Sequence, residues 1–166
     1  MILVDHELKK LCSENQLVTP YDESLVNPSS IDLRLGKTIL LDCKGGFKEY
    51  DITGYTKQNP FRLKPLSFCL AQTLETVKIP ECNTSWLHLK SSRAREGLSH
   101  SLAGWIENGF NGVVTFELFN LRSKVFVPLY YGQKIAQLVV GETKKPSSVY
   151  NGKYQNATTV EASKDV

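Results

Sequence analysis

The most constraining feature of this sequence is a series of short strand-like segments, each closed by turn-forming residues. Residues 31–35 alternate apolar and polar side chains with the two-residue period of a strand, and Gly36 is expected to end that run. Similar segments cover residues 38–41, 67–74, 85–89, 113–119, 125–129 and 135–140. Gly and Pro pairs between them, such as Gly45-Gly46 and Asn59-Pro60, predict turns. Many short strands joined by turns predict a mainly β fold: a sandwich, a jelly roll or a small barrel.

Only the first residues depart from this pattern. Leu8, Leu11 and Cys12 fall on one face of a helix. Asp5 is the expected N-cap, and Glu7 suits the first turn because carboxylates are favoured at a helix N-terminus. The sequence therefore predicts one short N-terminal helix.

A chain of 166 residues supports one domain with a substantial core. The strand pattern ends near residue 145, and residues 146–166 are mostly polar. By composition this segment is a disordered tail. The tyrosines and lysine of its SSVYNGKYQN stretch favour an alternative, an arm that becomes ordered around a ligand.

Charge and apolar content exclude several partners. The formal charge of +3 comes without a long basic run, so nucleic acid is not an expected partner. No apolar run approaches a membrane span, and the first ten residues lack the order of a secretory signal, so a cytoplasmic protein without membrane contact is expected. The cysteines have neither paired spacing nor a CxxC motif, which argues against structural zinc and a disulfide framework.

Three segments could carry chemistry. In LKSSRAREGL (89–98), cations and hydroxyls directly follow a strand, which suits a phosphate pocket as well as a solvated basic loop. In VVTFELFN (113–120), Glu117 shares a strand face with Val113, Thr115 and Phe119. That face is either exposed or lines a polar pocket, where burial would raise the carboxyl pKa and suit it to acid–base work. In AGWIENGFNG (103–112), glycines permit close approach to a ligand and Glu107 adds a carboxylate, although a plain hairpin explains the Asn-Gly pairs equally well.

Five motifs occur in the order expected of one family. They are NPSSIDLRLG (27–36), KSSRAREGL (90–98), AGWIENGFNGVVTFELFN (103–120), GQKIAQL (132–138) and YNGKYQN (150–156). The chain thereby resembles the dCTP deaminases of the dCTP deaminase and dUTPase superfamily over nearly its whole length. The resemblance implies a homotrimer of distorted jelly-roll subunits with active sites shared between chains. Residues 1–145 would form a dUTPase-like β domain, and residues 146–166 a C-terminal arm over the active site.

The resemblance also implies roles for individual residues. Glu117 matches the general base, while Ser91 and Arg95 match the residues that hold the reacting end of the nucleotide and its water. The implied substrate-binding residues are Lys90, Ser92, Arg93, Ala103, Gly104, Trp105, Glu107, Thr115, Phe116, Gln137, Tyr150 and Lys153. Mg²⁺ would arrive on the triphosphate, because this hard cation favours phosphate oxygens. Zinc is not expected, because the H-x-E and P-C-x-x-C signature of the zinc deaminases is absent.

The leading expectation is hydrolytic deamination of dCTP to dUTP and ammonia. The alternative is a bifunctional enzyme that also cleaves dUTP to dUMP and pyrophosphate, and Ala103-Gly104-Trp105 is more similar to that group. A second alternative is a catalytically weak nucleotide-binding regulator, with dUTP or dTTP as further ligands.

Four positions depart from the family pattern. Glu107 stands where relatives carry Asp, and Ala157 where a glutamine of the arm is expected. Arg93 and Glu96 replace leucines, so the segment after the serines is expected to be more exposed.

Overall fold

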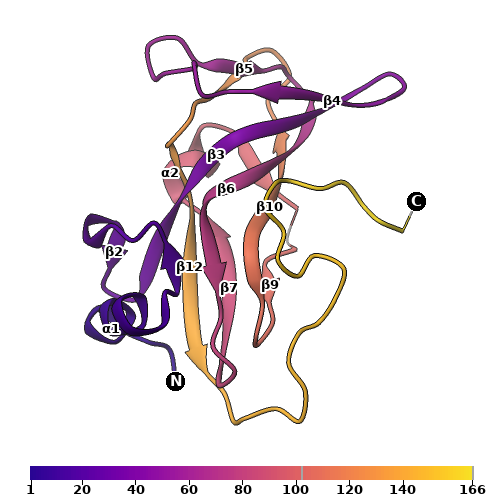
Figure 1. The fold of residues 1–166 in the computed structure, drawn as a ribbon. Coiled ribbons are helices and arrows are strands. Elements are labelled where there is room, and N and C mark those ends of the chain that lie inside the picture. Colours follow the sequence, from indigo (N-terminus) through magenta and orange to yellow (C-terminus); the bar gives the residue numbers. More distant parts are fainter. Residues whose placement is uncertain (102, 166) are drawn as a thin grey trace.

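The computed structural model describes residues 1–101 and 103–165, and its fold is mainly β with a short helix near the N-terminus (Figure 1). The helical elements are α1 (Asp5–Asn15), the 3-10 turn η1 (Glu23–Leu25) and α2 (Ser91–Arg95). The strands are β1 (Val18–Thr19), β2 (Val26–Asn27), β3 (Ser30–Cys43), β4 (Gly46–Asp51), β5 (Phe61–Leu63), β6 (Phe68–Lys78), β7 (Asn83–Leu89), β8 (Leu98–His100), β9 (Trp105–Ile106), β10 (Asn111–Asn120), β11 (Val127–Leu129) and β12 (Lys134–Glu142).

The main sheet curls, and it runs in the order β8-β10-β6-β3-β12-β7-β9. Strand β3 belongs to both halves of the curl, since its first residues pair with β12 and residues 35–41 pair with β6. Strands β1, β2 and β4 attach at the sides, and β5 pairs with β11 separately. This architecture confirms the expected mainly β, distorted jelly-roll class with a short N-terminal helix.

Gly36 does not end a strand, contrary to expectation. Strand β3 continues through it, and the pairing with β6 shifts register between Leu35 and Ile39. A Cβ on Gly36 would lie 2.7 Å from both the Gln72 Cγ and the Thr73 carbonyl oxygen. The missing side chain therefore lets β3 cross β6 closely, a common use of glycine within strands.

Helix α1 confirms the predicted element but not its cap. Val4, rather than Asp5, is the N-cap, and the Glu7 carboxylate accepts a hydrogen bond from the Val4 N–H at 2.9 Å. Leu8 and Cys12 are buried against the core, as the helical pattern predicts. No helix among the described residues is both long and apolar enough to cross a membrane.

The C-terminal segment after β12 lies against β9 and β10 (Figure 1). Ala157 forms a parallel bridge with Gly112, and its carbonyl accepts from the Val113 N–H at 2.9 Å. The Asn156 N–H donates to the Asn111 carbonyl at 2.7 Å. These backbone contacts hold the segment on the sheet.

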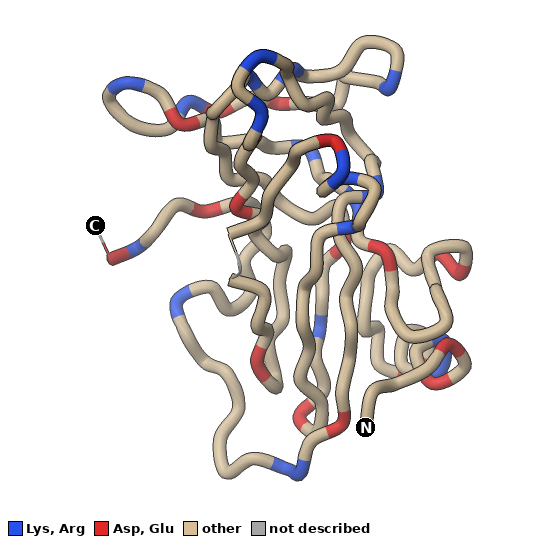
Figure 2. Tube along the Cα trace, turned by 180° about the vertical axis from the view of Figure 1, so that it is seen from behind, with Lys and Arg blue, Asp and Glu red and all other residues tan. Residues whose placement is uncertain are grey.

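Charged residues of both signs are spread over the chain and are intermixed, as Figure 2 shows. Many of them lie in loops and at the ends of strands. Local contacts, rather than one extended field, therefore determine the electrostatics of each site.

Candidate active site

A cavity of about 360 Å³ lies between β10, the loop around β9 and the C-terminal segment. Its volume falls in the range of small-molecule sites, roughly 300–1,000 Å³. The sequence-predicted residues that line it are Ala103, Trp105, Glu107, Thr115, Glu117 and Tyr150. These residues come from three separate segments of the chain, and the fold brings them together.

Strand β10 aims Glu117 into this cavity. Thr115, Glu117 and Phe119 are partly buried on one face, whereas Phe116 and Leu118 are buried on the other. Glu117 therefore lines a pocket, and the alternative of a fully exposed strand face is wrong. The register of β10 against β6 shifts between residues 113 and 115. Val113, which is expected on the same face, lines the same cavity as Thr115 and Glu117.

Burial raises the pKa of the Glu117 carboxyl, and the residue's own backbone N–H opposes this only in part. The imidazole Nε2 of His100 lies 3.5 Å from Glu117 Oε2. Burial, with a smaller contribution from His88, lowers the pKa of His100. Both side chains are therefore shifted toward their neutral forms. A carboxyl whose pKa is raised by burial accepts a proton more readily than an ordinary carboxylate, which suits it to acid–base work.

The serine segment lies outside this cavity. Ser91, Ser92 and Arg95 are exposed on α2, and none of them lines the space around Glu117 in the same chain. Arg93 and Glu96 are partly buried and form an ion pair, with Nη2 and Oε1 2.8 Å apart. The segment after the serines is therefore exposed at Ala94 and Arg95, as expected, but partly buried at Arg93 and Glu96, where each side chain neutralises the other.

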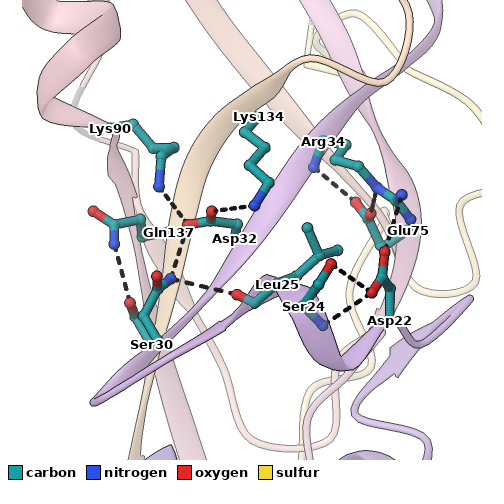
Figure 3. Close-up of polar contacts among 11 residues, drawn as sticks. Asp22, Ser24, Leu25, Ser30, Asp32, Arg34, Glu75, Lys90, Lys134 and Gln137 are labelled. Carbon is teal, nitrogen blue, oxygen red and sulfur yellow. Dashed lines mark hydrogen bonds and ion pairs between the residues drawn. The ribbon is translucent and has the colours of Figure 1, made fainter.

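A polar cluster contains Lys90 and Gln137, two of the implied substrate-binding residues (Figure 3). The Lys90 ammonium donates to Asp32 Oδ1 at 2.5 Å, and Lys134 lies 3.3 Å from Oδ2. The Gln137 amide donates to the Ser30 hydroxyl at 3.1 Å. Asp32 is buried although it lies on the polar face of the predicted strand, so this cluster anchors Lys90 at the end of β7.

The loop before β10 is not a plain hairpin. Strand β9 pairs with β7, whereas β10 pairs with β6 and β8. The Gly104 carbonyl accepts from the Leu87 N–H at 2.7 Å, and a Cβ on Gly104 would lie 2.5 Å from the Leu87 oxygen. Glycine is thus required by close packing on β7, and Trp105 stacks edge-on against Trp86 with ring centroids 5.1 Å apart.

The C-terminal segment completes the wall of the cavity. Its lining residues are Tyr150, Tyr154, Ala157, Thr159, Glu161 and Ser163. Gln155 does not join them: its amide donates to the Gly109 carbonyl and its side-chain oxygen accepts from the Asn111 N–H, both at 2.9 Å. Lys153 is exposed and pairs with Asp165, so it does not face the cavity.

Phe116 is fully buried in the core and does not line the cavity. Sequence reasoning missed His100, Thr159 and Glu161, whereas Tyr154 belongs to the SSVYNGKYQN stretch that the sequence offers as a ligand-ordered arm. The only sequence signal for His100 was the alternation of Leu98 and His100 around Ser99. That signal is too short to identify a strand paired with the one that carries Glu117.

The family model and the most similar relatives point to the same protein family. A family model described as dCTP deaminase-like matches residues 2–143. A protein of Aquifex aeolicus described as "dCTP deaminase, dUMP-forming" is 39% identical over 164 residues, covering 93% of this chain and 89% of its own. A Sulfurihydrogenibium protein with the same description is 35% identical over 175 residues, covering 99% and 97%.

Solved structures support the fold. The 2'-deoxycytidine 5'-triphosphate deaminase of Agrobacterium tumefaciens superposes with a TM-score of 0.68 at 18% identity, over 84% of this chain and 47% of that one. This chain thus spans about half the length of that enzyme. A mutant dUTPase from the Staphylococcus aureus phage phi11 gives a TM-score of 0.53 at 16% identity, over 81% and 90% of the two chains.

Proposed function

Because the chain belongs to the dCTP deaminase-like family, we propose that it is an enzyme that hydrolytically deaminates dCTP and carries the product on to dUMP. The observation that carries the first half is Glu117, a partly buried carboxyl with a raised pKa in a nucleotide-sized cavity. The second half rests on relatives at 39% and 35% identity that are described as dUMP-forming. These relatives favour the bifunctional alternative over the leading expectation of a product that remains dUTP.

In the deamination step, Glu117 takes a proton from a water molecule that attacks C4 of the cytosine ring. The carboxyl passes that proton to N3. It then transfers the proton of the new C4 hydroxyl to the departing amine, so that dCTP and water become dUTP and ammonia. A general base of this kind contributes about 10²–10⁴-fold to the rate. Its raised pKa makes it a better proton acceptor than an ordinary carboxylate.

Ser91 and Arg95 are proposed to orient that water and offset the developing charge. Both are exposed and lie outside the Glu117 cavity of their own chain. A homotrimer resolves this separation, because α2 of one subunit can complete the cavity of the next. The active site is accordingly proposed to be shared between neighbouring chains.

The triphosphate, with its bound Mg²⁺, is proposed to contact Lys90, Ser92 and Gln137. Asp32 and Ser30 already hold two of these side chains in place. Residues 146–165 are proposed to form the arm over the nucleotide, which is supported by Tyr150 and the other residues of this segment that line the cavity. Arg93 is a weaker candidate for phosphate binding because Glu96 already neutralises it.

The pyrophosphate-releasing step is assigned to Glu107, whose side chain lines the same cavity. Glu107 is proposed to support attack of a second water on the α-phosphorus, so that dUTP and water become dUMP and pyrophosphate. The extra methylene relative to Asp moves the carboxylate by about 1 Å, a displacement large enough to slow a positioned reaction about 100-fold. We therefore expect dUTP to be released in part before it is cleaved.

The test is incubation of the protein with dCTP and Mg²⁺, followed by separate assays of ammonia, dUTP, dUMP and pyrophosphate. Ammonia with dUMP and pyrophosphate supports the full proposal, and Glu107→Asp should raise the share of dUMP. Ammonia with dUTP alone supports the deaminase half and refutes the second half. Nucleotide binding without any product would refute both halves and favour the regulatory alternative.

The matched variants are Glu117→Gln and Glu49→Gln. Glu117→Gln should bind nucleotide with little change but lose ammonia release by at least about 100-fold. Glu49 is an exposed carboxylate on β4, which does not line the cavity, so its variant should keep normal activity. Near-normal deamination by Glu117→Gln would contradict the assignment of the base.

A further inference from the structure

His100 lies directly beside the proposed base. It ends β8, which pairs with β10 so that His100 is opposite Leu118, the residue after Glu117. Its Nε2 lies 3.5 Å from Glu117 Oε2, with side-chain exposures of 6% for His100 and 25% for Glu117. The imidazole therefore lies against the buried oxygen of the Glu117 carboxylate, away from bulk solvent.

Neither of the two facing atoms has another role in the described part of the chain. Both His100 Nε2 and Glu117 Oε2 are buried without a hydrogen-bond partner among residues 1–101 and 103–165. Leaving a buried polar atom unpaired is unfavourable, and more so for a charged group. Two such atoms 3.5 Å apart need only a few tenths of an ångström of movement to satisfy each other.

His100 does not itself face the nucleotide cavity. It lines a neighbouring cavity with Trp86, Ala94 and Gly104, and its ring packs edge-on against Phe116 with centroids 6.5 Å apart. Burial and His88 both favour the neutral imidazole, which can donate one N–H without becoming a full countercharge. A countercharge would lower the pKa of Glu117 and weaken it as a base.

We propose that His100 is a positioning residue that donates its Nε2–H to Glu117 Oε2 and so fixes the orientation of the carboxylate toward the reacting water. This inference rests on the proposed function of Glu117 as the general base. In the open site the contact is long, which is common for catalytic hydrogen bonds before substrate is bound. Bound nucleotide and the neighbouring subunit would shorten it by excluding water from the carboxylate.

The test compares three substitutions. His100→Gln retains a side-chain N–H donor at a similar reach, whereas His100→Leu and His100→Phe are apolar, and Phe keeps the ring packed against Phe116. We expect the Gln variant to stay within about 3-fold of wild type. The apolar variants should lose about 10–100-fold in kcat with KM nearly unchanged, the range found when a residue that orients a functional group is removed. The acidic limb of their kcat profile should also move to higher pH, since the carboxylate loses a donor.

Equal kcat values and equal pH profiles for the Gln and apolar variants would overturn the inference and reduce His100 to a packing residue. Two apolar variants are used so that poor folding of one, judged by thermal unfolding, leaves the other to decide. If the wild-type protein shows no deamination, the proposed function fails by itself. The hydrogen bond is then tested by NMR titration of the Glu117 carboxyl ¹³C. A higher Glu117 pKa in the apolar variants than in wild type and His100→Gln supports the hydrogen bond. Identical titration curves in all four proteins refute it.

Discussion

Asp32 offers the most direct test of the polar cluster in Figure 3. Its side chain is 3% exposed and contacts two ammonium groups, Lys90 (21% exposed) at 2.5 Å and Lys134 (46% exposed) at 3.3 Å. Asp32→Asn keeps the shape and the acceptor for the Asn27 amide but removes the charge. The two lysines then lose their common partner while remaining partly excluded from water.

The expected loss in the free energy of unfolding lies between two limiting cases, a fully buried and a fully exposed ion pair. Breaking a fully buried ion pair costs about 3–5 kcal/mol, and an exposed pair contributes about 0–1 kcal/mol. Because both lysines reach solvent in part, a loss of about 1–3 kcal/mol is expected. For a chain of this size, 1 kcal/mol corresponds to roughly 2–4 °C in Tm, so a loss of about 2 kcal/mol lowers Tm by about 4–8 °C.

Differential scanning calorimetry measures this loss, with Glu81→Gln as the control. Glu81 and Lys145 are 3.2 Å apart and both well exposed, so this variant should change stability by less than about 1 kcal/mol. Asp32→Asn should also raise KM for dCTP, because Lys90 loses its fixed position. A Tm within a degree of wild type would refute the reasoning about the cluster.

Two further predictions concern titratable groups. Burial raises the folded-state pKa of Glu117, so stability from its neutral form is lost as pH rises through that pKa. Glu117→Gln should therefore unfold at a higher temperature than wild type at pH 8, and the difference should close as pH falls below about 4. Burial also raises the pKa of Cys12 to about 11 and of Cys69 to about 12, whereas Cys43 and Cys82 are exposed. Mass spectrometry after native alkylation at pH 8 should show modification of Cys43 and Cys82 only, and early modification of Cys69 would contradict the packing of β6.

Much of the fold was readable from local pattern. The period of residues 31–35 and of 113–119, and the apolar face of the first helix, predict elements that the structure contains. The same patterns place Glu117 on one face of its strand with Thr115 and Phe119, and the structure decides that this face is partly buried. The family motifs add the order of these segments and the expectation of a nucleotide site.

Other features were decided only by packing between distant segments. Asp32 is one of the polar residues in the alternation of residues 31–35, and only the curl of the sheet shows that Lys90, after β7, and Lys134, on β12, lie beside it. Gly36 reads as a strand end, yet β3 crosses β6 there and continues.

For Glu117, the sequence by itself determined the residue and the face of its strand, because side-chain alternation is a property of the local backbone. The tertiary structure alone decided that His100 is its neighbour and that Ser91 and Arg95 of the same chain lie outside its cavity. Strand pairing between β8 and β10 depends on the burial and hydrogen bonding of the whole sheet. The local sequence pattern therefore contains no signal for the pairing of β8 with β10.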